Sequence, residues 1–563
     1  MGKGYSDKKV IEILISNCIN QGLKHIVISP GSRNAPLILS FSACPTIKCH
    51  VVVDERCAAF FALGMAQQLN EPVAIVCTSG TAVLNYAPAL AEAFYQNIPI
   101  IAITADRPTE WLDQEDGQTI NQVNIFQNFT KHSCTLPVDI INQEDEWLTY
   151  RSISEAFYYA KERGKGPVHI NIPLREPLYG RMSDIKAARE AIIQLKGEAK
   201  LSNDQLNELA RQISSHPKVM FLIGMREPNN LLNKVVSQFA TLPNTVVLTE
   251  TTSNLFGDQI ISTIDRVLAT INPQEQEDYT PTLLITLNGP LVSRQIKQFI
   301  KRNKPQEHWH IDLFSHHLDP YQALTLNIEA EPAYLLNELL ERIGTIKGNY
   351  NSLWSNKNSQ GKLIHNNYLA KTPWCDLKAF EAIFQHLPSS YQLQLGNSTP
   401  VRYGQLFNLP YYETFSNRGT SGIDGSISTA AGAAFASQKP TLLLVGDISA
   451  LYDSNGFWHK QPINNLKTII INNSGGGIFR FIQGPAETDE LEEFFETSQE
   501  TDFAHLAALH QINYQKIISL EELTIYLPLF YKSKQCEILE IVTPSKLNAQ
   551  ILRNYFETLK NTI

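Results

Sequence analysis

The chain of 563 residues is too long for one hydrophobic core, which predicts roughly two to four domains. Its hydrophobic share of 43% and charged share of 18% are those of globular proteins that fold in water. The net charge of −9, with no cluster of lysines and arginines, argues against nucleic acid as a partner. No apolar run reaches the about 18 residues that a membrane span requires, so we expect no stable membrane insertion.

The eight cysteines are scattered along the chain and form no CxxC pair. This spacing is typical of reduced thiols, and the N-terminal residues lack the pattern of a secretion signal. We therefore expect a cytoplasmic location.

The first predicted domain spans residues 1–185 and alternates strands with helices. Strands are predicted at 24–29, 51–54, 72–78 and 99–104, and helices at 55–68 and 84–95. Glycine, proline and aspartate punctuate the strand ends. This alternation favours a parallel sheet.

Two further α/β domains are predicted, at residues 186–345 and 373–563. The predicted strands of the central domain lie at 219–224, 245–248, 282–287 and 309–312, and those of the last at 391–395, 413–416, 441–446, 468–472 and 536–542. The central domain has no glycine-rich phosphate loop, which favours a structural or substrate-shaping role over a nucleotide site. The segment 346–372, rich in Asn, Ser, Gly and Lys, is predicted to be a linker.

Two polar clusters follow apolar strands of the last domain, at residues 446–449 (GDIS) and 472–476 (NNSGG). Open α/β sheets bind ligands at the carboxyl ends of their strands. The side chains of Asp447 and Asn473 and a backbone carbonyl at Gly475 are hard oxygen ligands, which suit Mg2+ (or Mn2+) when diphosphate oxygens complete the shell. The glycines allow backbone to approach phosphate, and a helix N-terminus favours the anion.

This pattern resembles the thiamine-diphosphate motif, which is GDG followed, after a helix and a strand, by an asparagine. Ile448 stands here in place of the last glycine. Alone, the Gly-Asp-Ile sequence fits an ordinary turn at a strand end equally well. The two clusters together predict a thiamine-diphosphate site.

Glu55 follows a predicted strand and begins a helix. One interpretation is an acid that the helix macrodipole favours. The other is catalytic. A carboxyl group at N1′ of the aminopyrimidine ring favours the imino tautomer, which then removes the proton from C2 of the thiazolium ring. Apolar surroundings would raise the carboxyl pKa and promote this proton sharing.

Several motifs are similar to those of the SEPHCHC synthase (MenD) family of menaquinone biosynthesis, where SEPHCHC is 2-succinyl-5-enolpyruvyl-6-hydroxy-3-cyclohexene-1-carboxylate. They are SPGSRNAPL (29–37), TADRP (104–108), GQTINQ (117–122), GNS (396–398), SNRGTSGIDG (416–425) and NNSGGGIF (472–479). The resemblance implies three doubly wound parallel-sheet domains (pyrimidine, central, diphosphate) and a homodimer or homotetramer, with each cofactor between the first domain of one subunit and the third of another. It also implies decarboxylation of 2-oxoglutarate and 1,4-addition of the product to isochorismate.

Both implied substrates are dianions, and four arginines lie in loops at predicted strand ends. Arginine binds carboxylates bidentately and keeps its charge. The resemblance places the following residues around the substrates: Ser32, Arg33, Arg107, Gln118, Ser398, Arg402, Arg418 and, from a basic pair whose first member is Ser293 here, Arg294. It assigns the cofactor to Glu55, Ile423, Gly446, Asp447, Ile448, Ser449, Asn473, Gly475, Gly476, Ile478 and Phe479.

Two alternatives stay open from the sequence. One is another thiamine-dependent 2-oxo acid decarboxylase or carboligase, such as an acetolactate synthase, although no flavin loop is visible in the central domain. The other is a non-catalytic protein on the same fold, against which the intact Glu55, Asp447 and Asn473 argue. The sequence distinguishes neither dimer from tetramer nor the carboxylate that each arginine binds.

Overall fold

The computed structural model describes the chain except for residues 1–3, 163, 186–191, 193, 196, 198–199, 314–316, 410, 482–483 and 562–563. The chain forms two compact units. The first contains residues 1–196, 419–441 and 449–466, and the second contains residues 197–418, 442–448 and 467–563. The predicted boundary after residue 185 falls beside residues outside the described part of the chain.

The first unit contains a parallel six-stranded sheet in the order β3-β2-β4-β5-β7-β6. Its strands are β2 (His25–Ile28), β3 (Lys48–Val51), β4 (Val73–Cys77), β5 (Ile100–Asp106), β6 (His132–Thr135) and β7 (Val168–Pro173). Its helices are α1 (Lys9–Asn20), α2 (Ala35–Ala43), α3 (Glu55–Leu69), α4 (Thr81–Leu84), α5 (Ala87–Gln96) and α6 (Gln143–Lys161), and the short strands β1 (Tyr5–Ser6) and β8 (Arg181–Met182) pair beside it.

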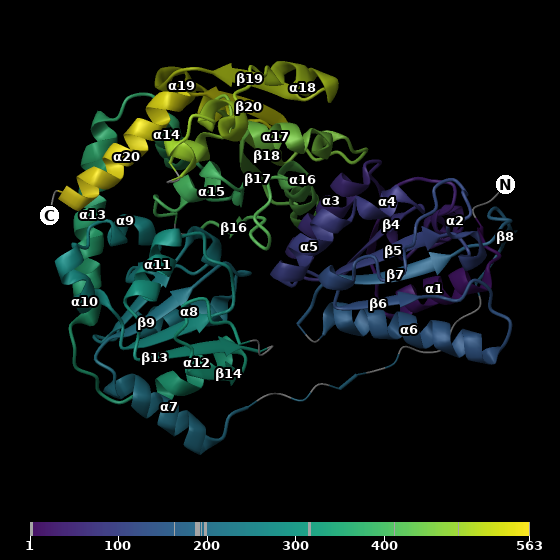
Figure 1. Ribbon diagram of the computed structural model, residues 1–563, viewed down its shortest axis with the longest axis horizontal. Helices are drawn as coiled ribbons and strands as arrows, with labels where there is room; N and C mark the ends of the chain where they lie inside the picture. The colour runs from purple at the N-terminus through teal and green to yellow at the C-terminus, as the bar shows by residue number, and fades with distance from the viewer. Residues whose placement is uncertain are drawn as a thin grey trace. The chain divides into compact units, whose positions relative to one another are not determined.

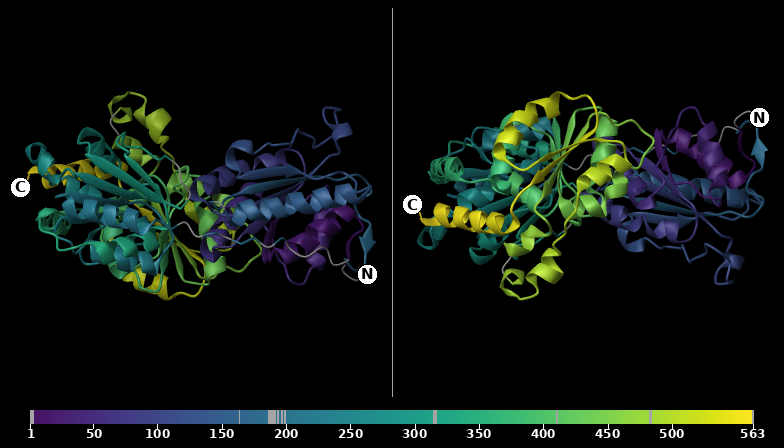
Figure 2. Two further views of the ribbon diagram at one scale, coloured as in Figure 1. Left: turned by 90° about the horizontal axis from the view of Figure 1, so that it is seen from below. Right: turned by 90° about the horizontal axis from the view of Figure 1, so that it is seen from above.

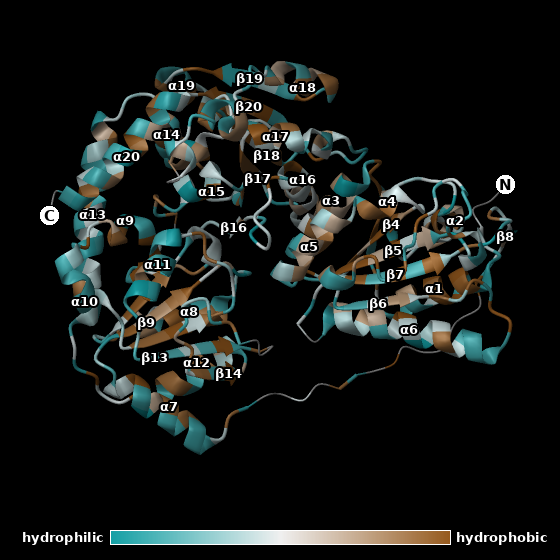
Figure 3. Cartoon of the chain, viewed as in Figure 1, coloured by the Kyte–Doolittle hydropathy of each residue, from teal (hydrophilic) through white to brown (hydrophobic). Residues whose placement is uncertain are grey.

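Helices cover both faces of this sheet (Figures 1 and 2). Helices α1 and α6 pack against each other on one face, and α3 and α5 do so on the other. The inner strands β4, β5 and β7 are fully buried, and they stand out as hydrophobic in Figure 3, whereas the outer helix α6 is largely hydrophilic. This pattern is the one expected for a parallel sheet between two helical layers.

Helix α16 (Ser426–Ser437) also belongs to the first unit and packs closely on α3. A Cβ atom on Gly64 would lie 2.0 Å from the Thr429 carbonyl oxygen, and one on Gly432 would lie 1.9 Å from the Phe61 carbonyl oxygen. Real Cβ atoms do not approach that closely, so glycine is required on both helices at the crossing. This contact fixes the helix that Glu55 begins.

The second unit contains a parallel sheet in the order β11-β10-β9-β12-β13-β14. Its strands are β9 (Val219–Ile223), β10 (Thr245–Thr249), β11 (Ile260–Ile261), β12 (Leu283–Leu287), β13 (Glu307–Asp312) and β14 (Leu326–Glu329). The helices of this region are α7 (Asn203–Ser215), α8 (Asn230–Phe239), α9 (Ile264–Leu268), α10 (Gln276–Tyr279), α11 (Arg294–Arg302) and α12 (Pro332–Arg342).

Strand order reverses between β9 and β12, which is where open sheets of this order bind dinucleotides. The loops that follow these two strands instead meet each other. The Met225 N–H donates to the Pro290 carbonyl at 3.0 Å, and a Cβ on Gly224 would lie 2.2 Å from the Gly289 carbonyl oxygen. The protein's own backbone therefore occupies this crevice.

The third sheet, also in the second unit except for the first residues of β17 and β18, has the order β16-β15-β17-β18-β20-β19. Its strands are β15 (Gln392–Leu395), β16 (Thr414–Phe415), β17 (Thr441–Gly446), β18 (Leu466–Asn472), β19 (Asn513–Ile517) and β20 (Glu537–Val542). Its helices are α14 (Asp376–His386), α15 (Thr399–Gly404), α17 (Asp447–Tyr452), α18 (Phe503–Leu509), α19 (Leu520–Lys532) and α20 (Ser545–Asn561). This strand order repeats that of the first sheet. The three predicted doubly wound sheets are thus confirmed.

The segment 346–372 differs from the expected linker, because most of it forms the helix α13 (Tyr350–Lys371). Tyr350 and Trp354 lie one turn apart and are almost fully buried, as are residues further along the same helix. Their packing outweighs the high content of Asn and Ser, which occupies the solvent side. No helix in the described part of the chain is long and apolar enough to cross a membrane.

Candidate active site

Glu55 is the first residue of α3, directly after the strand β3 and its short extension. The neighbouring Asp54 is the N-cap, and its side chain accepts a hydrogen bond from the Cys57 N–H at 3.2 Å. Capping is therefore the role of Asp54. Burial raises the pKa of the Glu55 carboxyl above its ordinary value, its own backbone N–H opposes that shift, and Asp54 adds to it. A carboxyl group whose pKa is raised holds a proton more readily than an exposed carboxyl group does.

The loop before α16, which carries Ile423, is held within the first unit. The Ser449 hydroxyl donates to the Ile423 carbonyl at 2.6 Å and lies 3.0 Å from the Ser426 hydroxyl. Gly425 packs on the ring of Phe60, where a Cβ atom would lie only 2.2 Å from the ring. Ser449 is one of the residues predicted to bind the cofactor, and in this structure its hydroxyl holds the backbone of Ile423 in place.

The same loop is anchored at its start by a buried carboxylate of α5. Glu92 is 1% exposed and accepts the N–H groups of Gly419 and Thr420, each at 2.7 Å. Sequence reasoning missed Glu92, because no local motif marks it. A carboxylate that accepts two successive amides fixes the chain at the residue after Arg418.

The substrate residues predicted for the first sheet lie at its carboxyl edge. Ser32 and Arg33 follow β2, and Arg107 follows β5, with β4 between these two strands. The Ser79 hydroxyl, after β4, donates to the Gln118 backbone carbonyl at 2.9 Å, which brings the loop of Gln118 to the same edge. The structure therefore brings this set together.

Both arginines of this edge have partners within the first unit. The buried Arg33 donates to the Leu174 carbonyl at 2.9 Å and lies 3.2 Å from the Glu176 carboxylate. Arg107 pairs with Asp116 at 3.1 Å. Glu176 and Asp116 are partly or fully exposed, so an incoming dianion can replace them at little cost.

The predicted metal ligands come together at the carboxyl ends of β17 and β18. Asp447 is 5% exposed, and its two oxygens accept the N–H groups of Ile448 at 2.7 Å and Gly475 at 2.8 Å. Burial raises the pKa of Asp447 to about 7, since these hydrogen bonds only partly offset the loss of hydration. A buried carboxylate of this kind gains from a cation.

Asp376 orients the second predicted ligand. Its carboxylate accepts a hydrogen bond from the Asn473 side-chain NH2 at 3.0 Å, which leaves the side-chain carbonyl of Asn473 on the opposite side of the amide group. Asp376 is fully buried at the start of α14, and burial raises its pKa to about 6. Sequence reasoning missed this residue because it lies 97 residues from Asn473.

An oxygen donor set of carboxylate, amide carbonyl and backbone carbonyl fits Mg2+, which keeps its remaining positions for phosphate and water. Gly475 has φ of +141°, and a Cβ there would lie 2.5 Å from the Glu496 carbonyl oxygen. The Gly476 N–H donates to that same carbonyl at 2.7 Å. No group of three or more His, Cys, Asp or Glu side chains suited to a metal occurs among the described residues, so the fit depends on Asn473, backbone and diphosphate.

The acidic segment after this loop packs against it. Glu496 is 2% exposed and its carboxylate accepts from the Arg480 guanidinium at 2.7 Å. The rings of Phe479 and Phe495 lie 5.6 Å apart. Phe479 and Ile478, both predicted as cofactor residues, are thus half-buried beneath a helical turn rather than in open solvent.

Ser398 and Arg402 follow β15 in the second unit. Ser398 has φ +72° and ψ −123°, a backbone conformation that is strained for any residue with a Cβ. Its carbonyl accepts a hydrogen bond from the Arg402 guanidinium at 2.6 Å. The Arg418 guanidinium donates to the Asn397 side-chain carbonyl at 3.0 Å, so both arginines are held at the end of the same strand.

Arg294, the first residue of α11, belongs to the same cluster. Burial lowers the pKa of Arg402 to about 10, and the positive charges of Arg418 and Arg294 lower it further than Asp265 can restore. Lys297, one turn along α11, has a lowered pKa for the same reasons, burial first. Sequence reasoning missed Lys297. Positive charge is therefore concentrated in this cluster of the second unit. A bound dianion would reduce the repulsion among the side chains of the cluster.

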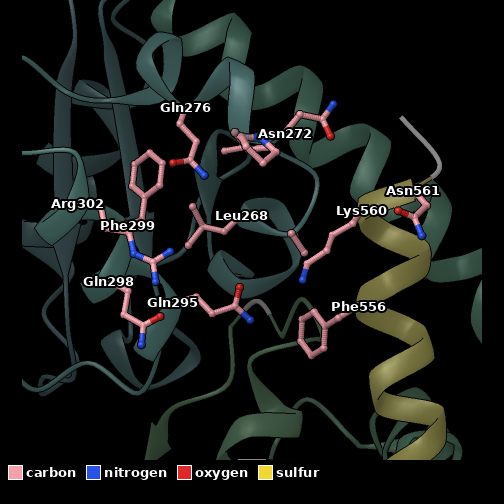
Figure 4. Close-up of a pocket in the computed structure, with 13 residues that line it drawn as sticks. Leu268, Asn272, Gln276, Gln295, Gln298, Phe299, Arg302, Phe556, Lys560 and Asn561 are labelled. Carbon is pink, nitrogen blue, oxygen red and sulfur yellow. The ribbon is translucent and has the colours of Figure 1, made fainter. Parts of the chain in front are cut away.

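A separate pocket of about 590 Å3 lies elsewhere in the second unit, between α9, α11 and α20. Figure 4 shows Phe556 and Lys560 of α20 facing Gln295 and Phe299 of α11. None of the predicted substrate or cofactor residues lines it. The candidate active site is therefore the set of strand-end loops and not this pocket.

The chain is similar to known proteins both in sequence and in fold. The family "Thiamine pyrophosphate enzyme, N-terminal TPP binding domain" matches residues 8–125. The crystal structure of benzoylformate decarboxylase from Polynucleobacter necessarius matches with a TM-score of 0.71, covering 96% of this chain and 99% of that one, at 15% identity, which shows the shared fold.

Two curated relatives are named 2-succinyl-5-enolpyruvyl-6-hydroxy-3-cyclohexene-1-carboxylate synthase. The protein from Flavobacterium psychrophilum is 42% identical, covering 99% of this chain and 100% of its own length. The protein from Porphyromonas gingivalis is 41% identical, covering 99% of this chain and 98% of its own length. At this identity over essentially the whole sequence, the chain belongs to the 2-succinyl-5-enolpyruvyl-6-hydroxy-3-cyclohexene-1-carboxylate synthase family.

Proposed function

We propose that the protein decarboxylates 2-oxoglutarate and adds the remaining four-carbon unit to isochorismate, giving SEPHCHC and CO2 in menaquinone biosynthesis. The bond between C1 and C2 of 2-oxoglutarate breaks, C1 leaves as CO2, and the former carbonyl carbon forms a bond with the isochorismate ring by 1,4-addition. The observation that carries the proposal is the cluster of Arg294, Arg402 and Arg418, in which mutual repulsion and burial lower the pKa of Arg402 to about 10. Two dianionic substrates match this charge.

Thiamine diphosphate, when bound, supplies the nucleophilic carbon and the electron sink that this decarboxylation needs. Glu55 then holds a proton at N1′ of the aminopyrimidine ring, for which its raised pKa suits it. Asp447, the side-chain carbonyl of Asn473 and the backbone carbonyl of Gly475 would hold Mg2+ (or Mn2+).

The other assigned residues shape the cofactor pocket. Gly446 and Gly476 would let the backbone approach the diphosphate at the ends of β17 and β18, beside the backbone of Ile448. Ile423, positioned by Ser449, supports the cofactor from the loop before α16. Ile478 and Phe479 exclude water from one side.

For the substrates, we assign two groups of side chains. Ser32, Arg33, Arg107 and Gln118 lie at the edge of the first sheet, and Ser398, Arg402, Arg418 and Arg294 lie in the second unit. We further propose pyrimidine, central and diphosphate domains at residues 1–185, 186–345 and 373–563. The protein would act in the cytoplasm as a homodimer or homotetramer, with each cofactor between the first domain of one subunit and the third of another.

The test is an assay of the full-length protein with thiamine diphosphate, Mg2+, 2-oxoglutarate and isochorismate, with the product identified by mass. We expect SEPHCHC and stoichiometric CO2, and no product when any one component is omitted. A second reaction replaces both substrates by pyruvate. Acetolactate from pyruvate, or a bound flavin in the visible spectrum, together with no product from isochorismate, would refute the proposal.

A further inference from the structure

The segment 250–254, which we call the strand end, directly follows strand β10 and is almost fully buried. It contacts each of the three segments that carry the arginine cluster of the second unit. Its residues make hydrogen bonds to the loop before Arg294, to the end of helix α15, and to strand β16 ahead of Arg418.

Glu250 holds the loop before Arg294. It is 1% exposed, and its two carboxylate oxygens accept the N–H groups of Val292 and Ser293, each at 2.7 Å. The Glu250 N–H donates to the Ser253 hydroxyl at 2.9 Å, which fixes the backbone from which this side chain extends. Hydrogen bonds to an ionised acceptor are about twice as strong as neutral ones. Glu250 therefore fixes the two residues that immediately precede Arg294.

Ser293 connects this loop to helix α11. Its hydroxyl accepts the Ile296 N–H at 3.1 Å as the N-cap of the helix, and it also donates to the Asp265 carboxylate. Because Arg294 is the next residue, its Cα position follows from Glu250 and Ser293. The loop is closed on its other side by the Met225–Pro290 hydrogen bond.

Thr251 and Asn254 connect the same strand end to the other two arginines. The Thr251 N–H donates to the Gln405 side-chain carbonyl at 2.9 Å, directly after the helix that carries Arg402. The Asn254 side chain accepts the Thr414 N–H at 2.8 Å and donates to its carbonyl at 3.1 Å, four residues before Arg418. One short segment thus sets the spacing of three cations from two sheets.

We propose that Glu250 is a positioning residue for substrate binding, which holds Arg294 in register with Arg402 and Arg418 so that the three bind one dianion. The inference rests on the proposed function, because it assigns the cluster to a dianionic substrate. The charge relations support it. Burial raises the pKa of Glu250 to about 7, its two amide partners lower it, and the charges of Asp265 and then Arg418 act on it in opposite directions, Asp265 raising and Arg418 lowering the pKa.

The test is a double-mutant cycle with Glu250→Gln, Arg294→Ala and the combined variant in the full-length enzyme. Glutamine keeps the shape but turns an NH2 group toward one of the two amides, so the loop loses one anchor. We expect Glu250→Gln to raise KM for one of the two substrates by about tenfold, and to have no further effect when Arg294 is already absent. Thiamine-diphosphate affinity should stay unchanged.

The control is Asp319→Asn. Asp319 lies in the same central sheet domain, and one of its carboxylate oxygens accepts two backbone amides, those of Ala323 at 2.8 Å and Leu324 at 3.2 Å, in an exposed loop without arginine. We expect unchanged KM for this variant. If the effects of Glu250→Gln and Arg294→Ala multiply, or if Asp319→Asn raises KM as much, Glu250 has only a general structural role and the inference fails.

Two further measurements keep the outcomes distinct. If Glu250→Gln does not fold, Glu250→Asp provides the cycle, since it retains the charge with a shorter reach and should give a smaller rise in KM. Direct titration of 2-oxoglutarate into each variant reports the coupling without turnover. Absence of SEPHCHC from the wild-type assay refutes the proposed function, whereas normal wild-type turnover with no coupling between Glu250 and Arg294 refutes only the inference.

Discussion

Replacing Arg402 by methionine is expected to stabilise the unliganded protein while it lowers activity. Burial and the charges of Arg418 and Arg294 lower the pKa of Arg402 from arginine's ordinary value to about 10. At neutral pH the Arg402 guanidinium is charged in both the folded and the unfolded chain. Its burial and the repulsion from its neighbours therefore destabilise the folded state. The difference corresponds to about 3 kcal/mol, which solvent screening of the partly exposed side chain reduces to about 1 kcal/mol.

The assay is thermal unfolding of wild type and Arg402→Met, each with and without 2-oxoglutarate, together with steady-state kinetics. We expect a higher Tm for the unliganded variant, a smaller rise in Tm on adding 2-oxoglutarate, and a loss of about 2–5 kcal/mol in kcat/KM. The control is Arg342→Met, which removes an arginine that pairs with Glu338 at 2.9 Å and should not raise Tm. A lower Tm for Arg402→Met with unchanged kinetics would show that Arg402 is a structural residue.

Four further results are expected. Glu55→Gln should reduce SEPHCHC formation by at least about 100-fold with little change in Tm, because it removes the shared proton; unchanged turnover would contradict that role. Gly432→Ala should cost about 1–3 kcal/mol in unfolding free energy by overpacking the α3–α16 crossing, as urea titration would show, whereas Ser398→Gly should relieve strain and raise Tm. Without Mg2+, the stability of wild type relative to Glu250→Gln should fall as pH rises from about 5 to about 7, because the raised pKa of Glu250 means that the folded wild-type chain holds a proton that the unfolded chain has released; a difference that does not change with pH would contradict that shift.

The residues that the sequence predicted well are those whose chemistry is local. Asp447 and the glycines after Asn473 directly follow apolar strands, and a polar residue in that place lies at the carboxyl edge of the sheet whatever the order of the strands. The same argument placed Arg107 in a loop after a strand, whereas Arg402, also predicted to lie in such a loop, lies in the helix α15. These predictions needed only the period of the strands and the position where it ends.

The residues that the sequence did not predict form hydrogen bonds with partners that lie far away in the sequence. Asp376 lies 97 residues from the Asn473 amide that it orients, and Glu250 lies 42 residues from the Val292 amide that it accepts. Each is an isolated acid in its local sequence, so no spacing marks it. The helix α13 was missed for a different reason, since its composition resembles a linker and the few large side chains that bury it, Trp354 among them, are sparse.

The central sheet has the strand order of dinucleotide-binding sheets, but its crevice is used differently. In the order 3-2-1-4-5-6, the crevice at the reversal point is the usual place for a dinucleotide. Here Gly224 and Gly289 allow the two loops to close on each other, so the backbone fills that crevice. The loop after β12 then continues directly into Arg294, and the neighbouring strand end supplies Glu250 to hold it. A sheet edge of the kind that binds cofactors in other proteins is thereby available to place a cation at the third sheet.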